Sequence, residues 1–190
     1  MKEYDKIAAW FAANRSRHIG VPEVRAVTRG LPKGAKVLDL GCGTGIPLSE
    51  ALCRSGFAVF GIDSSQEMVK RFRSNCPQAD VECETIQNSD FFNLSFAAVV
   101  AWGVLFHLPA AAQKRAIAKI SQHLNPGGFF LFTAGKEKGT VKETMNGVLF
   151  RYTSLGSDSY RKLLKKNGFE VLDEYDDDWK NHVFVAKKTG

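Results

Sequence analysis

Residues 36–45 read KVLDLGCGTG, a short apolar run that ends at an aspartate and continues into three glycines at alternate positions. The apolar residues predict a buried strand at 37–40, and Pro47 stands where the first turn of a following helix would begin. Glycine loses more backbone entropy on folding than any other residue, so three glycines this close indicate that something approaches the backbone here. A strand, a glycine turn and a helix in this order predict a ligand site beyond the carboxyl end of the strand.

The length and composition of the chain predict one globular domain. Its 190 residues are enough for one sizeable core, and its contents of 44% hydrophobic and 24% charged residues are close to the averages of soluble proteins. No apolar run approaches the roughly 20 residues of a membrane helix, and the N-terminus lacks the apolar stretch of a secretory signal. We therefore expect a cytoplasmic protein with no membrane partner.

The cysteine spacing and the net charge bear on whether the chain holds a zinc ion, forms disulfides or binds a phosphate-rich partner. Cys42, Cys53, Cys76 and Cys83 form no Cys-x-x-Cys pair, which argues against a zinc site or a disulfide framework and fits a reducing compartment. The formal net charge is +6 with an isoelectric point near 9.2, and the run RKLLKK at 161–166 supplies much of the excess. We interpret this run as a solvated helix face rather than a surface for a phosphate-rich partner.

Strands and helices alternate along most of the chain. The predicted strands cover 37–40, 57–63, 79–85, 96–104 and 129–135, and the predicted helices cover 4–15, 47–56, 65–75 and 110–124, with one more short helix within 20–34. Such alternation, with strands that are apolar throughout, predicts an α/β fold in which helices cover both faces of a parallel sheet. Ser64 and Glu67 have the spacing of a capping box, and NPGG at 125–128 is expected to be a turn.

The end of the chain has a different pattern. A helix is predicted at 158–169, and two strands follow at 170–178 and 182–188 with only a short break between them. A break this short favours an antiparallel hairpin at the edge of the sheet.

Three kinds of nucleotide ligand compete for the glycine turn. A phosphate loop needs a lysine after the glycines, and a dinucleotide site prefers Gly or Ala at the sixth position, where this chain has Ile46. Asp39 ends the first strand, and a carboxylate there suits a cation better than a pyrophosphate. Asp63 ends the second strand, 18 residues after Gly45, where it can accept hydrogen bonds from both hydroxyls of a ribose. These features predict a positively charged ribonucleoside without phosphate, which is the chemistry of S-adenosylmethionine (SAM).

The sequence resembles the class I SAM-dependent methyltransferases, of the small type that acts mostly on small molecules. The resemblance lies in VLDLGCGTG at 37–45, VFGIDSSQEMV at 59–69, WGVLFHL at 102–108 and ISQHLNPGGFFLFT at 120–133. It implies a Rossmann-like three-layer sandwich, with a mostly parallel seven-stranded sheet and an antiparallel C-terminal hairpin. It also implies SAM as cofactor, with S-adenosylhomocysteine (SAH) as product. One departure is Ala97, where the family often has an aspartate that is usually structural.

The resemblance also divides the chain and implies the residues that hold SAM. Within one methyltransferase domain, 1–190, it implies an N-terminal helical cap (1–34), a SAM-binding core (35–135) and a substrate-side segment with the C-terminal helix and hairpin (136–190). The implied cofactor residues are Asp39, Gly41, Cys42, Gly43, Gly45, Asp63, Ser64, Met68, Glu84, Thr85, Trp102 and Gly103.

Each implied cofactor residue has a role in the family and a simpler structural alternative. Asp39 would orient the methionine end of SAM above the glycine turn, and Asp63 would bind its ribose; otherwise they are a strand-end acid and a helix cap. Met68 would line the adenine with Ser64, and Trp102 would lie where cofactor meets substrate; otherwise Met68 and Trp102 are core residues. Cys42 is interpreted as present for its small size rather than its reactivity.

One histidine is a candidate catalytic residue. Methyl transfer depends mainly on alignment, and a general base is needed only if the nucleophile holds a proton with a high pKa. His107 follows the fourth strand on the ligand side, and its imidazole is expected to titrate near 6–7. Its alternative role is structural, bonded to a nearby carbonyl. His18, His123 and His182 are expected to lie away from the strand ends.

Aromatic residues are candidates for the substrate pocket. Tyr4 and Phe11 in the first helix, with Phe150 and Tyr152, are predicted to roof the pocket and exclude water, and Trp10 is a further candidate. Either Arg15 or Arg17 would meet a carboxylate of the cofactor or substrate. The acids of DEYDDD at 173–178 are interpreted as solvated surface rather than a Mg²⁺ site, so no metal is predicted.

The predicted function is transfer of a methyl group from SAM to an O or N atom of a small molecule, by a monomer or homodimer. Two alternatives stay open. An RNA or other nucleic-acid methyltransferase is favoured by the basic isoelectric point, but the fourth strand ends in AWGVLFHLP, without an Asn/Asp-Pro-Pro-Tyr segment or a Pro-Cys nucleophile. A catalytically silent SAM-binding protein is favoured by the lack of an obvious base.

Overall fold

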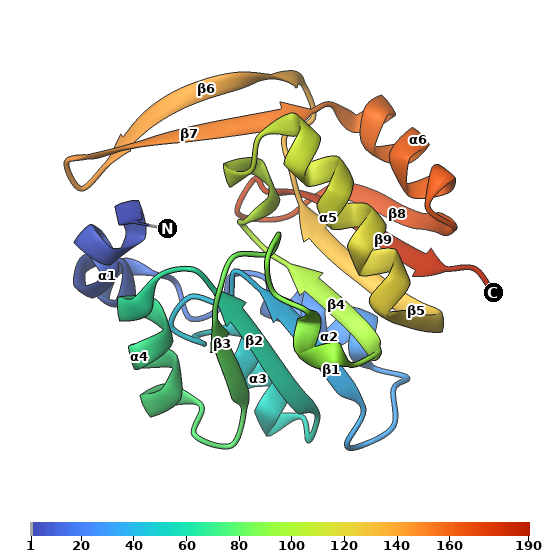
Figure 1. Ribbon diagram of the computed structural model, residues 1–190, viewed down its shortest axis with the longest axis horizontal. Coiled ribbons are helices and arrows are strands. Elements are labelled where there is room, and N and C mark those ends of the chain that lie inside the picture. The colour runs from blue at the N-terminus through green and yellow to red at the C-terminus, as the bar shows by residue number, and fades with distance from the viewer. Residues whose placement is uncertain (1) are drawn as a thin grey trace.

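The computed structural model describes residues 2–190 and shows a central sheet between layers of helices (Figure 1). The main sheet has seven strands in the order β3-β2-β1-β4-β5-β9-β8. Their bounds are β1 Lys36–Leu40, β2 Ala58–Asp63, β3 Asp80–Cys83, β4 Phe96–Ala101, β5 Leu124–Thr133, β8 Phe169–Asp176 and β9 His182–Lys188. The first five strands are parallel, and β9 is antiparallel to both β5 and β8. The predicted fold class and its C-terminal hairpin are confirmed.

Helices cover both faces of this sheet. Their bounds are α1 Lys2–Asn14, α2 Val21–Thr28, α3 Leu48–Arg54, α4 Gln66–Asn75, α5 Ala110–His123 and α6 Ser157–Lys166, with 3-10 turns η1 Phe91–Asn93 and η2 Leu105–His107. Successive side chains of β1 point to opposite faces, so Leu38 belongs to the core cluster that includes residues of α5 and α6, and Val37 to the cluster that includes residues of α2 and α3. Residues 2–190 contain no helix with the length and apolar character that a bilayer crossing requires.

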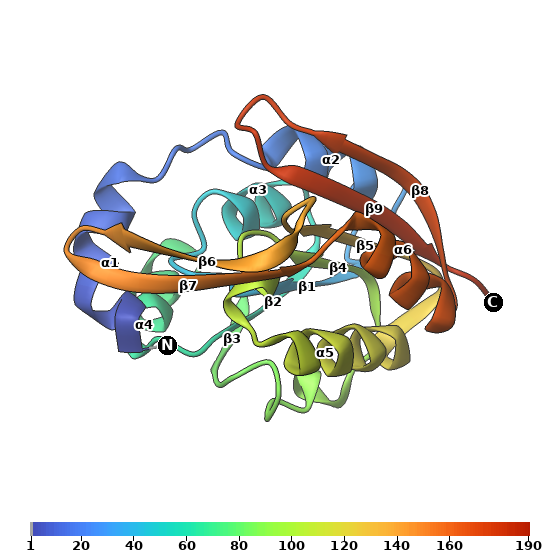
Figure 2. The same cartoon turned by 90° about the horizontal axis from the view of Figure 1, so that it is seen from above.

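A second, two-stranded sheet was not predicted from the sequence. It consists of β6 Lys138–Met145 and β7 Val148–Leu155, which pair antiparallel. Asn146 and Gly147 join them with φ values of 46° and 77°, so both turn residues are left-handed, as in the two-residue turns that close hairpins. Figures 1 and 2 show this hairpin extending from the main sheet toward α1.

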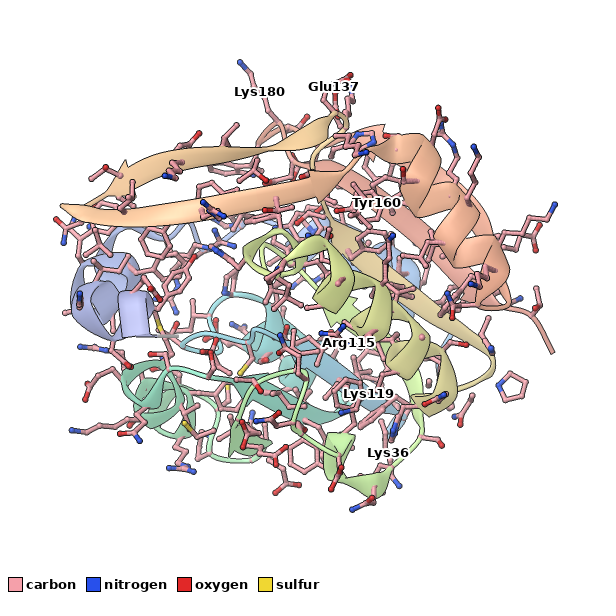
Figure 3. All side chains as sticks on the ribbon, turned by 45° about the horizontal axis from the view of Figure 1, so that its top comes forward. Lys36, Arg115, Lys119, Glu137, Tyr160 and Lys180 are labelled. Carbon is pink, nitrogen blue, oxygen red and sulfur yellow. The ribbon has the colours of Figure 1, made fainter. Side chains whose placement is uncertain are left out.

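Buried hydrogen bonds hold the base of the hairpin to the core. Gln113 of α5 donates from its amide to the carbonyls of Leu108 and Thr153, at 2.8 and 2.7 Å. The hydroxyl of Tyr160, in α6, donates to Oε1 of Gln113 at 2.6 Å. Tyr160 is labelled in Figure 3, between the hairpin and α5. Because these groups are buried, the network fixes β7 relative to the segment that follows β4.

Two local predictions were wrong. Ser65, not Ser64, caps α4, because its Oγ accepts from the N–H of Met68 at 3.2 Å. The carboxylate of Asp63 binds the N–H of Ser65 at 2.8 Å, which keeps the chain in a turn for one residue longer. The expected turn at 125–128 lies within β5 as an irregularity: β4 pairs at Phe96 with Leu124, but two residues later with Phe129.

Candidate functional site

A cavity of about 1150 Å³ opens at the carboxyl ends of the parallel strands. Its wall includes these predicted site residues: Tyr4, Phe11, Asp39, Gly41, Cys42, Gly43, Asp63, Ser64, Met68, Glu84, Thr85, Trp102, Gly103, His107 and Tyr152. They come from α1, from the carboxyl ends of β1 and β2, from α4, from the segments that follow β1 to β4, and from β7. The fold therefore brings most of the predicted cofactor and substrate residues to one cavity, while Gly45 and Phe150 do not line it.

The three glycines after β1 serve different purposes. Gly41, Gly43 and Gly45 all have left-handed φ, at 67°, 55° and 81°. A Cβ at Gly43 would meet no protein atom within 4 Å, so this side of the backbone is open to the cavity. A Cβ at Gly41 would lie 2.5 Å from Val104, and one at Gly45 would lie 2.8 Å from Sγ of Cys76. The prediction that Gly45 is a cofactor residue is corrected: Gly45 does not line the cavity, and Cys76, which follows α4, leaves no room for a side chain there.

Asp63 joins the glycine turn to the end of β2. Its Oδ2 accepts from the N–H of Gly43 at 2.9 Å and its Oδ1 accepts from the N–H of Ser65 at 2.8 Å. Burial raises the pKa of this carboxyl, while these two hydrogen bonds oppose the rise. Because each carboxylate oxygen has two lone pairs, Asp63 can accept further hydrogen bonds from a ligand in the cavity.

Asp39 is a buried carboxyl at the other side of the glycine turn. Its Oδ2 accepts from the hydroxyl of Ser49 at 2.6 Å. Burial raises its pKa to about 7, although the hydrogen bond from Ser49 and the charge of Arg15 favour the ionised form. Near neutral pH, a cationic group that enters the cavity beside Asp39 would therefore favour its ionisation.

Arg15 brings a positive charge into the same cavity. Its guanidinium is half-buried, lies 5.4 Å from the centre of the Phe11 ring and makes no ion pair with any residue from 2 to 190. One of its terminal nitrogens lies 4.0 Å from where a Cβ of Gly103 would be. Arg17, the other candidate, points elsewhere and pairs with Glu50 at 3.6 Å. Arg15 is thus the arginine available to a carboxylate in the cavity.

His107 lies inside a group of aromatic rings. Its Nε2 is 3.1 Å from the hydroxyl of Tyr4, and its ring centre lies 5.0 to 5.1 Å from those of Phe106 and Tyr152. Burial lowers the pKa of His107 to about 4 and raises that of Tyr4. The expected titration near 6–7 is therefore wrong, because burial disfavours the imidazolium. The hydrogen-bond partner of His107 is the hydroxyl of Tyr4 rather than the expected backbone carbonyl.

Several aromatic and large side chains differ from their predicted places. Phe150 is only 2% exposed and lies behind the wall, with its ring centre 5.0 Å from that of Tyr4. Trp10 is 39% exposed and does not line the cavity. Met68 and Trp102 are both buried and lie on the cavity wall. For those two residues, the core and ligand interpretations are compatible.

The sequence analysis assigned 136–190 to the substrate side and named Phe150 and Tyr152 there, but it missed the other wall residues of this segment. The hairpin contributes Val141, Glu143, Met145 and Ser154, the loop between β8 and β9 contributes Lys180 and Asn181, and the first residue of β9 contributes His182. The Asn146-Gly147 pair, flanked by alternating residues, is a hairpin signal that would have located the hairpin. His182 was expected to lie away from the strand ends, but the antiparallel course of β9 begins there.

The acids of 173–178 are paired rather than simply solvated. Glu174 and Asp176 each lie 2.8 Å from a ring nitrogen of His182. Asp177 is buried, and its Oδ1 accepts from the N–H groups of Trp179 and Asn181. The described part of the chain contains no group of three or more His, Cys, Asp or Glu arranged to hold a metal ion.

Comparison with known sequences finds a matching family and curated relatives. Residues 37–128 match a family model described as a methyltransferase domain. A carboxy-S-adenosyl-L-methionine synthase of Actinobacillus pleuropneumoniae is 30% identical over 165 residues, which are 82% of this chain and 62% of the relative. A ubiquinone biosynthesis O-methyltransferase of a Shewanella species is 28% identical over 147 residues, which are 73% of this chain and 61% of the relative. The chain spans about three fifths of the length of these two relatives.

Solved structures share the fold over nearly the whole chain. The CcbJ methyltransferase of Streptomyces caelestis aligns with a TM-score of 0.80 at 17% identity, over 99% of this chain and 98% of that one. SAM-bound CalS10, described as an amino pentose methyltransferase of Micromonospora echinaspora, aligns with a TM-score of 0.75 at 19% identity, over 96% and 95%. At these identities the likeness is one of fold.

Proposed function

We propose that this chain, whose residues 37–128 match a methyltransferase domain, is a class I SAM-dependent methyltransferase that binds SAM at the strand ends and transfers its methyl group to an O or N atom of a small molecule. One observation carries the proposal: Asp39, Asp63 and the open side of Gly43 border the same cavity. The group that SAM supplies is a methyl on a positively charged sulfur, already activated for displacement. The chain has to bind the donor, align an acceptor and exclude water.

The polar groups of the cavity match the parts of SAM. Asp63 keeps lone pairs free for the two ribose hydroxyls after accepting from Gly43 and Ser65. The backbone at Gly43 leaves room where any other residue would place a side chain. Asp39 and Arg15 carry the opposite charges needed for the ammonium and carboxylate of the methionine end. We assign these four residues to the cofactor.

The adenine is assigned to the far side of Asp63. Ser64, Met68, Glu84 and Thr85 line the cavity after β2 and β3. Met68 is buried and offers an apolar, polarisable surface to a ring. Oε1 of Glu84 accepts from the N–H of Thr85 at 2.7 Å, so Glu84 lies folded over the segment that follows β3.

The chemistry that we propose relies on alignment rather than on a general base. With a pKa near 4, His107 is neutral at physiological pH but accepts a proton only weakly. Together with Tyr4 it shapes the acceptor side of the cavity. The cavity continues past the cofactor residues to the β6–β7 hairpin, which leaves space for an acceptor and favours an enzyme over a silent SAM-binding protein.

The charge of the cavity favours a small molecule over a nucleic acid. Its wall carries five carboxylates, those of Asp5, Asp39, Asp63, Glu84 and Glu143. Only two side chains of the wall, Arg15 and Lys180, carry a fixed positive charge. The cavity is therefore acidic although the chain has a net charge of +6. A phosphate-rich strand would be repelled there, whereas a cationic donor would be attracted.

Calorimetric titration with SAM and SAH tests the proposal. We expect both to bind the wild-type protein, and Asp63→Ala to lose about 2–4 kcal/mol of affinity with the charge-assisted bonds to the ribose. Asp80→Ala is the matched control, because Asp80 is exposed at the start of β3 and does not line the cavity. A folded protein that binds neither compound would overturn the proposal. Binding without SAH formation in the presence of small amines or alcohols would favour the silent alternative.

A further inference from the structure

The two faces of the β6–β7 hairpin carry different charged side chains. Alternation along β6 and β7 places Val141, Glu143, Met145, Tyr152 and Ser154 on the cavity wall. Lys142 pairs in register with Arg151, and both belong to the opposite face. Within the hairpin, all of which the structure describes, Glu143 is thus the one charged residue that faces the cavity.

The carboxylate of Glu143 forms no ion pair with the described residues. No lysine, arginine or histidine among residues 2–190 lies within ion-pair distance of its carboxylate, since the nearby Lys142 and Arg151 belong to the other face. Its side chain is exposed, so a ligand that enters the cavity can reach it. The carboxylate also contributes to raising the pKa of Tyr152, after burial, which is consistent with the two side chains facing the same space.

Aromatic rings surround the space beside Glu143. Phe150 lies directly across the hairpin from Glu143, and its ring is stacked on that of Tyr152 with centres 6.2 Å apart. The ring of Phe106 meets Tyr152 edge-on at 5.4 Å. Ring faces attract ammonium groups and also pack against apolar surface. One carboxylate beside such rings suits a ligand that carries a cation on an apolar body.

We propose that the methyl acceptor is the nitrogen of an amine, recognised as its ammonium by Glu143 and the rings of Tyr152 and Phe106. This inference rests on the proposed function and narrows its acceptor from O or N to N. An acidic acceptor would find no cation on this part of the wall. Arg15 lies near enough to Tyr4 and Asp39 for its charge to affect both, and we assign it to the carboxylate of SAM; Lys180 points away from the body of the molecule (Figure 3).

The reaction with an amine balances without a protein base. The bound ammonium loses one proton to water, which reaches the exposed Glu143. The nitrogen lone pair then forms the N–C bond while the S–C bond of the donor breaks and its electron pair stays on sulfur. The product is a methylated ammonium, which carries the positive charge that the sulfonium had. The neutral His107 fits this course, because no proton has to be held by the protein.

Binding of matched probes to the SAH-loaded protein tests the inference. The probes are 2-phenylethylamine, 2-phenylethanol and 3-phenylpropanoate, which share an apolar ring and differ in the charge of the end group. We expect the amine to bind at least about tenfold more tightly than the alcohol, and the carboxylate to bind most weakly. Glu143→Gln should remove the preference for the amine and leave the affinities for SAH and 2-phenylethanol unchanged.

Glu137→Gln is the matched control variant. Glu137 immediately precedes β6, is exposed and does not line the cavity, and Figure 3 shows it at the outer rim. Its replacement should leave all four affinities unchanged. Three results would overturn this inference but not the proposed function. They are equal binding of the amine and the alcohol, no binding of the amine at millimolar concentration, and an amine affinity that Glu143→Gln leaves unchanged. Failure to bind SAH would instead overturn the proposed function, and the same titrations on the unloaded protein would still test Glu143.

Discussion

The hydroxyl of Tyr4 lies 3.1 Å from Nε2 of His107, although 103 residues separate them in the sequence. The contact joins α1 to the turn that follows β4. Both groups are neutral near pH 7, because burial lowers the pKa of His107 and raises that of Tyr4. The N-terminal helix is thus tied to the acceptor side of the cavity by a hydrogen bond that does not depend on charge.

Tyr4→Phe should weaken the docking of α1 without changing the aromatic wall. The variant keeps a ring that meets Phe11 edge-on at 5.4 Å and loses only the hydrogen bond. We expect the free energy of unfolding to fall by about 0.5–1.5 kcal/mol, measured by urea denaturation. The pKa of His107 should stay low in the variant, since burial is its main cause. An NMR titration that finds His107 near its usual value in Tyr4→Phe would contradict this account.

His107 should make the fold less stable in mildly acidic solution. Its pKa is about 4 in the folded protein and about 6.5 in the unfolded chain, so the unfolded chain binds the proton first as the pH falls. Its contribution to stability is present above pH 6.5 and is lost between 6.5 and 4. We expect this loss to be about 3 kcal/mol larger in the wild-type protein than in His107→Gln, measured by denaturation at each pH. Parallel pH profiles of the two proteins would show that the imidazole is not shielded from water.

Asp39 should make SAM binding depend on pH. Its pKa of about 7 means that much of it is protonated below pH 7, whereas a cationic ligand favours the ionised form. We expect SAM affinity to rise by up to about tenfold per pH unit below 7 and to level off above 8. Asp39→Asn should bind more weakly and without this pH dependence, because the amide keeps an acceptor for Ser49 but has no charge. Proton release on binding, measured by calorimetry in buffers of different ionisation enthalpy, provides the check, and its absence in the wild-type protein would rule out the linkage.

Gly43→Ala should mainly weaken SAM binding, whereas Gly45→Ala should mainly destabilise the fold. Both place a side chain at a left-handed position, which costs about 1–2 kcal/mol in each variant. At Gly43 the new methyl group meets no protein atom and enters the cavity, so we expect SAM affinity to fall at least tenfold with little further loss of stability. At Gly45 it would lie 2.8 Å from Cys76, so stability should fall by a further 1–3 kcal/mol or so. Thermal unfolding and SAM titration of both variants give the comparison; equal effects on affinity would mean that Gly43 does not contact the cofactor.

The sequence by itself determined the succession of strands and helices along the chain, the glycine turn after β1 and the acids near the ends of β1 and β2. These features depend on neighbours along the chain. Val37, Leu38 and Leu40 are apolar because both faces of β1 are covered, whereas Asp39 is the penultimate residue of β1 and Asp63 is the last residue of β2. Since parallel strands end at the same edge of a sheet, the pairing of β1 with β2 brings these acids together.

Only the tertiary structure decided what the individual side chains do. The cap of α4 moved from Ser64 to Ser65 because Asp63 binds the N–H of Ser65, and Gly45 faces Cys76 because of where α4 ends. The pKa of His107 depends on rings brought from α1 and β7, and Glu143 faces the cavity because the hairpin register turns it there. Burial and electrostatic environment are set by contacts between residues far apart in sequence, and a local pattern contains no record of those contacts.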